Sequence, residues 1–131
     1  MRSPLKSDVA TEIILATDAL AKRKLTYVRL VHSAAWVLFA SAILLLPVTV
    51  WMDRLAWALW LSALVMVEVS ILVANGMRCP LTSVAARYTA DRSDNFDIYL
   101  PAWLARHNKR IFGSLFVAGE LFLLYRLFAT P

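Results

Sequence analysis

The sequence has very few of the residues from which disulfide, metal and cofactor sites are built. It contains one cysteine, Cys79, so it can form neither an intrachain disulfide nor a Cys-x-x-Cys motif. The two histidines, His32 and His107, do not form a His-Glu-x-x-His motif, and no Walker loop, dinucleotide fingerprint or Ser-His-Asp set is present. We therefore expect no metal and no cofactor, and favour a protein that is not an enzyme.

Two further absences bear on the architecture. No internal repeat of roughly 20–50 residues is visible, which argues against a transporter built from inverted repeats. Residues 30–52 contain no Asp, Glu, Lys or Arg. Hydrophobic residues make up 60% of the 131-residue chain, and its mean hydropathy is +0.63. Soluble domains are roughly 45–50% apolar, so the composition predicts a membrane protein.

Three stretches are apolar and long enough to cross a bilayer as helices, which takes about 20 residues. Pro47 is expected to end the first, and Asp53 to cap the second. The third contains Glu120, a cost that its Leu, Phe, Ile and Val residues roughly offset. The predicted fold is therefore all-α, a polytopic membrane helical bundle within a single domain. Its three transmembrane helices are expected over residues 27–47, 55–75 and 110–128.

The distribution of basic residues predicts the orientation. Of the 14 Lys and Arg residues, 12 precede the first span or lie between the second and third. Because Lys and Arg are retained in the cytoplasm, the N-terminus is expected inside and the C-terminus in the periplasm or outside the cell. Topology thus explains the net charge of +5, and no nucleic-acid partner is expected. A signal peptide cleaved after Ala42 is rejected, because the apolar run continues beyond that site.

Two segments are expected to be structured on the cytoplasmic side. Residues 8–24 form a predicted amphipathic helix with Val9, Ile13, Ala16 and Leu20 on one face. This helix could lie on the bilayer or dock on a partner, but we favour packing against the rest of the protein.

The loop over residues 76–109 is the second of these segments. We expect it to contain a short helix from Thr82 or Ser83 through Ala90, and an interfacial segment, residues 96–104, at headgroup depth. Asp91, Asp94 and Asp97 recur every third residue, but a calcium loop needs alternate acids and a final Glu, so a solvated turn is favoured. Anionic lipid headgroups are the expected contacts of Arg106, Lys109 and Arg110.

An intramembrane polar cluster is predicted from His32, Glu68, Asn75 and Glu120. From a rise of about 1.5 Å per residue, His32 and Glu68 share one depth, and Asn75 follows Glu68 on the same helix face. Buried ionisable groups in a membrane normally face a partner. One hypothesis is a proton or ion path; the favoured alternative is a set of hydrogen bonds that holds the helices together. A haem or metal site would need a second well-placed histidine.

The juxtamembrane motif Cys79-Pro80-Leu81-Thr82 contains the only thiol. A nucleophilic cysteine needs an aligned base, and His107 cannot be placed beside it from the sequence, so an inert or structural thiol is favoured.

This motif, with Arg87 and Ile98-Tyr99-Leu100-Pro101, resembles a family of short bacterial integral membrane proteins of unassigned function. His32 followed by Val37-Leu38-Phe39 is similar to that family's first span, and the resemblance covers about residues 28–125. It implies a bacterial inner-membrane location and supplies no reaction.

The leading functional hypothesis is a non-enzymatic accessory or assembly partner of a membrane complex. Its expected partners are the lipid bilayer and either further copies of itself or a larger complex. Two alternatives stay open: a proton or ion conductor using the intramembrane Glu and His, and a membrane enzyme with a metal or a reactive thiol.

Overall fold

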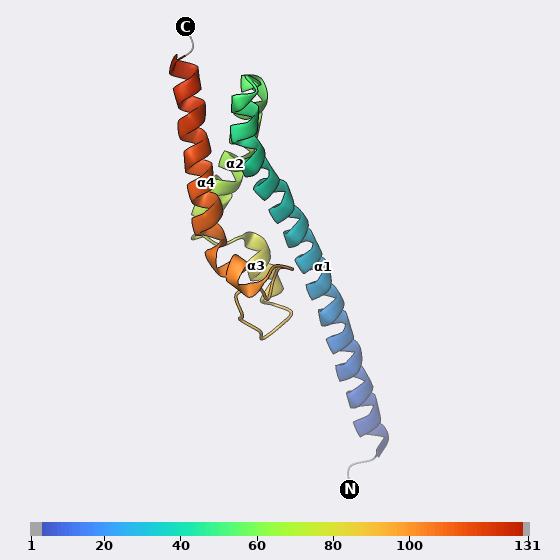
Figure 1. Ribbon diagram of the computed structural model, residues 1–131. Coiled ribbons are helices and arrows are strands. Elements are labelled where there is room, and N and C mark those ends of the chain that lie inside the picture. Colours follow the sequence, from blue (N-terminus) through green and yellow to red (C-terminus); the bar gives the residue numbers. More distant parts are fainter. Residues whose placement is uncertain (1–3, 130–131) are drawn as a thin grey trace.

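The computed structural model describes residues 4–129. Arg2, one of the basic residues before the first predicted span, lies outside this range. The described chain forms four helices and no strand (Figure 1). These are α1 (Pro4–Trp51), α2 (Leu55–Ala74), α3 (Pro80–Ala85) and α4 (Ala102–Ala129). In the described part, α1, α2 and α4 are long and apolar enough to cross a membrane. The predicted all-α bundle with three helices of spanning length is confirmed.

Helix α1 is one unbroken helix of 48 residues, where the sequence predicted an amphipathic helix followed by a separate span. At about 1.5 Å per residue it is about 72 Å long. No Gly or Pro occurs from Leu5 to Leu46, so nothing in this stretch interrupts the helix. The helix also continues past Pro47 to Trp51. In lipid an unpaired backbone group is so costly that continuing the helix is better than ending it there.

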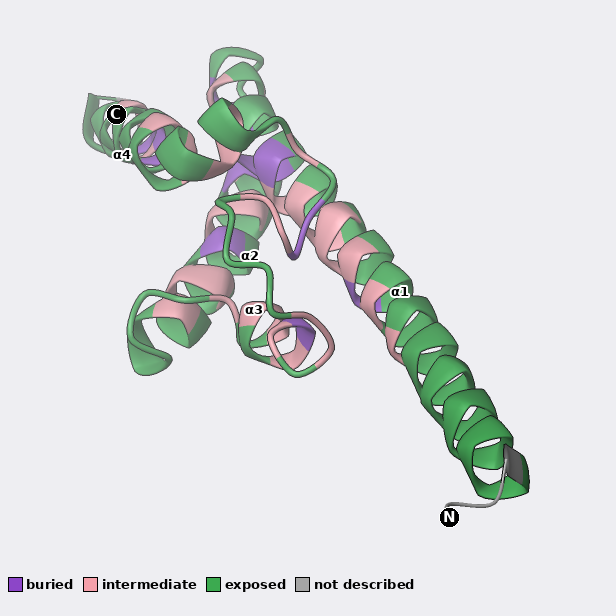
Figure 2. Cartoon of the chain, turned by 90° about the horizontal axis from the view of Figure 1, so that it is seen from below, coloured by how far each residue is buried: buried purple, intermediate pink, exposed green. Residues whose placement is uncertain are grey.

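The first half of α1 projects away from the other helices (Figures 1 and 2). The residues predicted to form its apolar face are exposed, including Val9, Ile13 and Leu20. The expected packing of this segment against the rest of the protein is therefore not observed among the described residues.

The connection between α1 and α2 is a tight turn at Asp53, whose φ is 57°. Aspartate tolerates this left-handed conformation better than most residues. The predicted N-cap role of Asp53 is not found: Arg54 occupies that position, and no side-chain cap is made. The Asp53 carboxylate instead forms an ion pair with Arg126 near the end of α4. We call this end of the bundle the Asp53 end and the opposite one the α3 end.

A glycine-dependent turn ends α2 and leads into α3. Gly76 has a φ of 66°, the Met77 N–H donates to the Leu72 carbonyl at 2.7 Å, and the Gly76 N–H donates to Val73 at 3.3 Å. These two bonds define the Schellman motif, which favours glycine at this position. Helix α3 then starts with Pro80 in its first turn, a position where proline loses no helical hydrogen bond. It begins and ends earlier than the predicted Thr82 or Ser83 start and Ala90 end.

Helix α4 begins at Ala102, well before the predicted start at residue 110. The Ala105 N–H donates to the Pro101 carbonyl at 3.0 Å, so the helix forms directly after the proline. Arg106, Lys109 and Arg110 therefore lie in the first turns of α4 rather than in a loop.

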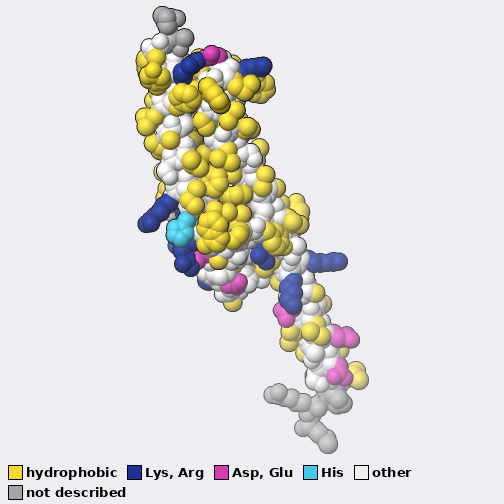
Figure 3. Space-filling model, viewed as in Figure 1, with side chains coloured by type: hydrophobic (Ala, Val, Ile, Leu, Met, Phe, Trp, Pro, Cys, Tyr) yellow, Lys and Arg dark blue, Asp and Glu magenta, His cyan; other side chains and the backbone are white. Residues whose placement is uncertain are grey.

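The core lies along α1, which contacts each of the other three helices, whereas α2 and α4 touch each other only sparsely. Gly119 permits the closest approach of α4, because a Cβ there would lie 2.9 Å from Leu46 Cδ2. The space-filling view shows a hydrophobic surface between two levels of charge, one at each end of the bundle (Figure 3). The buried core cluster is Ala42, Ile43, Leu46, Val50, Ala58, Val65, Phe116 and Leu123.

Candidate functional site

A large cavity opens at the α3 end, between α1, α2, α4 and the segment that joins α2 to α4. Its volume is about 1180 Å³, somewhat above the roughly 300–1,000 Å³ of typical ligand sites. Apolar side chains form the part that extends toward the middle of the bundle, among them Phe39, Val65 and Phe116. The polar lining groups lie at the α3 end and include His32, Glu68, Cys79, Thr82, Asp97 and Lys109.

Three of these polar residues, from three different segments, form a connected group. His32 Nδ1 on α1 lies 3.1 Å from the Asp97 carbonyl oxygen and 3.3 Å from its carboxylate Oδ2. Thr82 on α3 donates its hydroxyl to the same Oδ2. The Tyr99 N–H donates to Ser33 Oγ at 2.9 Å, which fastens the same segment to α1 one residue further along. The group therefore joins α1, α3 and the segment before α4.

The contacts between His32 and Asp97 define the protonation state of each residue. Both neighbours of His32 Nδ1 are acceptors, so Nδ1 carries a proton and donates it, and Nε2 is left as the other ring nitrogen. Burial raises the pKa of Asp97, but the hydrogen bonds from His32 and Thr82 outweigh burial and hold the pKa below its usual 3.8. Asp97 is thus a buried carboxylate at neutral pH.

The lowered pKa of Asp97 predicts a loss of stability in acid. A carboxyl whose pKa is lower in the folded state stabilises the fold at pH values above its ordinary pKa, and this contribution disappears as the pH falls through the folded value. We expect the melting temperature of the detergent-solubilised protein to fall below about pH 4, and to fall less steeply in Asp97→Asn. Asp18→Asn, on the exposed half of α1, should retain the full acid dependence; equal curves for both variants would contradict this assignment.

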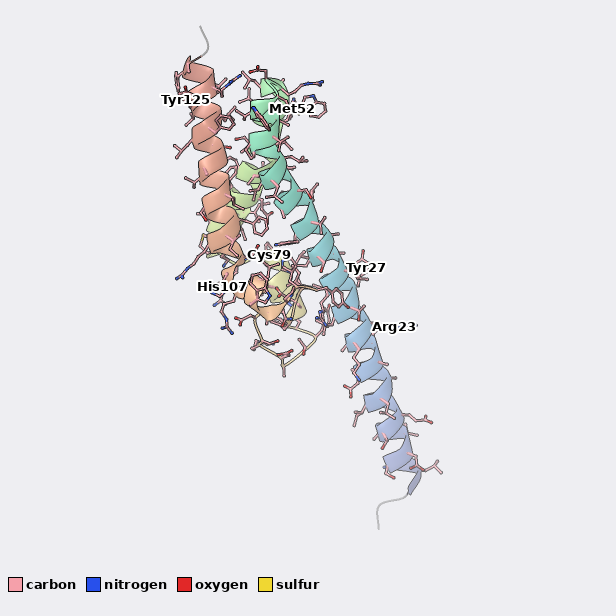
Figure 4. All side chains as sticks on the ribbon, viewed as in Figure 1. Arg23, Tyr27, Met52, Cys79, His107 and Tyr125 are labelled. Carbon is pink, nitrogen blue, oxygen red and sulfur yellow. The ribbon has the colours of Figure 1, made fainter. Side chains whose placement is uncertain are left out.

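Cys79 lies beside this group, at the position preceding Pro80 and the first turn of α3 (Figure 4). The thiol is half-buried, lines the cavity and interacts with the imidazole of His32. Along the chain, His107 is the nearer candidate base for this thiol, but it is exposed on α4 and its Nδ1 lies 2.8 Å from the Trp103 carbonyl. His32 is therefore the base candidate that was missed, and its separation from Cys79 along the chain hid it.

The predicted intramembrane cluster is divided between three places. Glu68 on α2 lines the same cavity and interacts electrostatically with His32, as their shared depth suggested. Asn75 instead closes the turn after α2, where its side-chain amide donates to the Arg78 carbonyl at 2.7 Å. Glu120 is on α4 outside the cavity lining, and its Oε1 is buried without a hydrogen-bond partner among the described residues.

Basic side chains surround the polar part of the cavity. Arg78, Arg92 and Lys109 line it, and within residues 4–129 none of them pairs with a carboxylate. Lys109 donates to the Met77 carbonyl, whereas Arg106 forms an exposed ion pair with Asp94 at 2.7 Å. Arg110 is exposed on the same part of α4. Three carboxyl groups also line the cavity: Asp94 pairs with Arg106 and Asp97 with His32, which leaves Glu68 as the one carboxyl group facing three basic side chains among the described residues.

The three aspartates spaced along the segment before α4 have separate partners. Asp91 accepts the Ser93 N–H at 2.9 Å, Asp94 pairs with Arg106, and Asp97 is bonded to His32. The three carboxylates do not converge on one point. Only Asp97 departs from the predicted solvated turn: it is buried, and its position between Phe96 and Ile98 is the sequence feature that could have indicated this.

A second polar contact that the sequence analysis missed closes the cavity wall between α1 and α4. Trp36 donates its indole N–H to Asn108 Oδ1 at 2.8 Å, and its ring packs edge-on against Phe112 with centroids 5.4 Å apart.

Within residues 4–129, no group of three His, Cys, Asp or Glu side chains is placed to hold a metal ion. Comparison with protein-family models, curated proteins and solved structures finds no significant match to this chain.

Proposed function

We propose that this is a bacterial inner-membrane protein that binds an amphiphile with an anionic headgroup in the cavity at the α3 end. In the proposed orientation the N-terminus and the α3 end face the cytoplasm, and the C-terminus faces the periplasm or the outside of the cell. Support for the orientation comes from the concentration of Lys and Arg before α1's apolar part and between α2 and α4.

The observation that carries the proposal is the division of the cavity into an apolar part and a polar part. Its apolar walls belong to the helices of spanning length, so an acyl chain placed there would remain at bilayer depth. Arg78, Arg92 and Lys109 would then surround the headgroup, at the level where basic residues meet anionic lipid. An amphiphile satisfies both parts of the cavity at once, whereas a wholly polar ligand would leave the apolar walls uncovered.

The other functional hypotheses fit the same features less well. A proton path needs a connected series of titratable groups, and Glu120 lies outside the cavity that contains His32 and Glu68.

An accessory role is compatible with amphiphile binding, and we retain it. The exposed apolar face of α1 is where a further copy of the chain or a larger complex would attach. The thiol-enzyme hypothesis gains a base and an orienting acid from the position of His32 and Asp97.

Two valines on α2 offer a matched test. Val69 lines the cavity and is half-buried, whereas Val67 is exposed and lies outside its lining. In vesicles containing a photoactivatable phosphatidylglycerol analogue, we expect Val69→Trp to lower crosslinking to the cavity walls by about tenfold, equivalent to about 1.4 kcal/mol of binding free energy. Val67→Trp should leave crosslinking unchanged.

Mass spectrometry of the crosslinked peptides would locate the analogue at the cavity residues, including Phe39 and Phe112. A phosphatidylcholine analogue should crosslink less, because it lacks net negative charge. The proposal fails if crosslinks fall only on the outer helix faces, or if both tryptophan variants behave alike.

A further inference from the structure

We propose that Cys79 is a nucleophile that accepts the acyl chain of a bound long-chain acyl ester or thioester, with His32 as its base and Asp97 as a positioning residue. This inference rests on the proposed function, because the amphiphile in the cavity is the acyl donor. It names the chemical class of that amphiphile and gives the cavity a reaction.

The arrangement contains the parts that activate a cysteine. A thiol becomes an effective nucleophile when a base takes its proton and a third group holds the base in orientation. The Cys79 carbonyl accepts the Thr82 N–H at 3.0 Å, and the Thr82 hydroxyl donates to the same Asp97 carboxylate that contacts His32. Cys79 therefore lies beside His32 at the lining of the cavity, and Asp97 holds Nδ1 of the imidazole through contacts at 3.1 Å and 3.3 Å. Because Nδ1 is the donor to Asp97, Nε2 is the ring atom that can accept a proton from the thiol.

The surroundings explain why these groups would act on an acyl chain. Cys79 and His32 line the polar part of the cavity, and the apolar part extends from there among Phe39, Val65 and Phe116. The carbonyl of an acyl ester lies between its hydrocarbon chain and its headgroup. With the chain in the apolar part and the headgroup near Lys109, that carbonyl falls at the level of the thiol.

A merely structural thiol would need none of these neighbours. Cys79 is only half-buried and lines the cavity together with His32 and Asp97, while inert structural cysteines are mostly enclosed by apolar groups. Asp97 is bonded by both His32 and Thr82, so the orientation of the imidazole is held from two segments.

The step requires no oxidant, reductant or metal. The Cys79 thiol gives its proton to His32 Nε2, and the sulfur attacks the acyl carbonyl carbon. A carbon–sulfur bond to Cys79 forms, and the bond from the carbonyl carbon to the oxygen or sulfur of the leaving group breaks. The imidazolium then returns the proton to the leaving alcohol or thiol. The products are an S-acylated Cys79 and a donor that has lost one chain.

The chain is suited to a direct test because Cys79 is its only cysteine. The full-length protein in vesicles would be incubated with alkyne-bearing palmitoyl-coenzyme A or, separately, with alkyne-bearing phosphatidylglycerol, which distinguishes the thioester donor from the oxygen-ester donor. We expect a covalent label that neutral hydroxylamine removes. Cys79→Ala should carry no label, and the label on Cys79→Ser should be slow to form and resistant to hydroxylamine.

Two further variants separate chemistry from folding. His32→Asn should lower the labelling rate by about 100-fold, the lower end of the usual contribution of a general base. Asp97→Asn should also slow labelling, and by a larger factor than it lowers crosslinking of the photoactivatable phosphatidylglycerol to the cavity. A merely structural role of Asp97 would reduce both readouts together.

The outcomes distinguish this inference from the proposed function. If the wild-type cavity crosslinks the lipid analogue but neither donor yields a hydroxylamine-sensitive label, the nucleophile is refuted and amphiphile binding stands. A hydroxylamine-resistant label on the wild-type protein also refutes it. If the cavity neither crosslinks nor becomes labelled, both proposals fail.

Discussion

Asp97→Ala is expected to lower the free energy of unfolding by about 1–3 kcal/mol, the usual cost of leaving buried polar groups without their hydrogen-bond partner. Asp97 is only 5% exposed, and its carboxylate is the shared partner of His32 and Thr82. Without the carboxylate, the Thr82 hydroxyl loses its acceptor, and His32 Nδ1 keeps only the carbonyl oxygen of residue 97. Unfolding in mixed micelles followed by circular dichroism would measure the loss.

Asp94→Ala is the matched control for this prediction. Asp94 lies three residues earlier and also pairs with a base, but its partner Arg106 is on the surface. Exposed ion pairs contribute about 0–1 kcal/mol, so this variant should remain close to the wild-type protein. Limited proteolysis should cut the segment between α3 and α4 faster in Asp97→Ala alone. Equal losses in the two variants would mean that Asp97 does not hold this segment to α1.

Leu46→Ala is expected to cost about 2–5 kcal/mol, the usual range for truncating a buried leucine to alanine. Leu46 is 1% exposed, and its side chain fills the space left by Gly119 on α4. The substitution would leave a gap between α1 and α4 that the lipid cannot reach. The melting temperature in detergent and the abundance in the membrane should both fall.

Leu44→Ala provides the comparison within the same turn of α1. Leu44 is 53% exposed and would face lipid, so truncating it opens no internal cavity. It should change the melting temperature only slightly. If Leu44→Ala were as destabilising as Leu46→Ala, the assignment of which face of α1 packs against α4 would be wrong.

The number and approximate position of the apolar helices could be predicted because these depend on local composition. Residues 30–52 lack formal charge, and α2 ends within one residue of the predicted boundary at Asn75. Gly76 explains this agreement, since its left-handed conformation ends the helix for a reason that is visible in the sequence.

At the other boundaries, the sequence does not show whether the helix ends or continues. Pro47 ends many helices in water, but here α1 continues beyond it because membrane-embedded backbone groups stay paired. Similarly, the polar residues before residue 110 were interpreted as loop, but they extend α4 toward Pro101. Polar side chains are compatible with either conformation, so their composition could not separate a loop from an exposed helical turn.

The site was predictable only in part because its contacts are distant along the chain. His32 and Glu68 could be placed at one depth by counting residues along two helices. The partner of His32 lies 65 residues away, in an irregular segment whose path no periodicity describes. His107 is nearer to Cys79 along the chain, but the tertiary fold brings Cys79 close to His32.

The unbroken course of α1 has a mechanical consequence. With no Gly or Pro from Leu5 to Leu46, the portion that projects from the bundle and the portion that carries His32 form one stiff rod. A twist applied near Val9 therefore reaches the imidazole as a rotation of the same rod, with no flexible joint between them to absorb it.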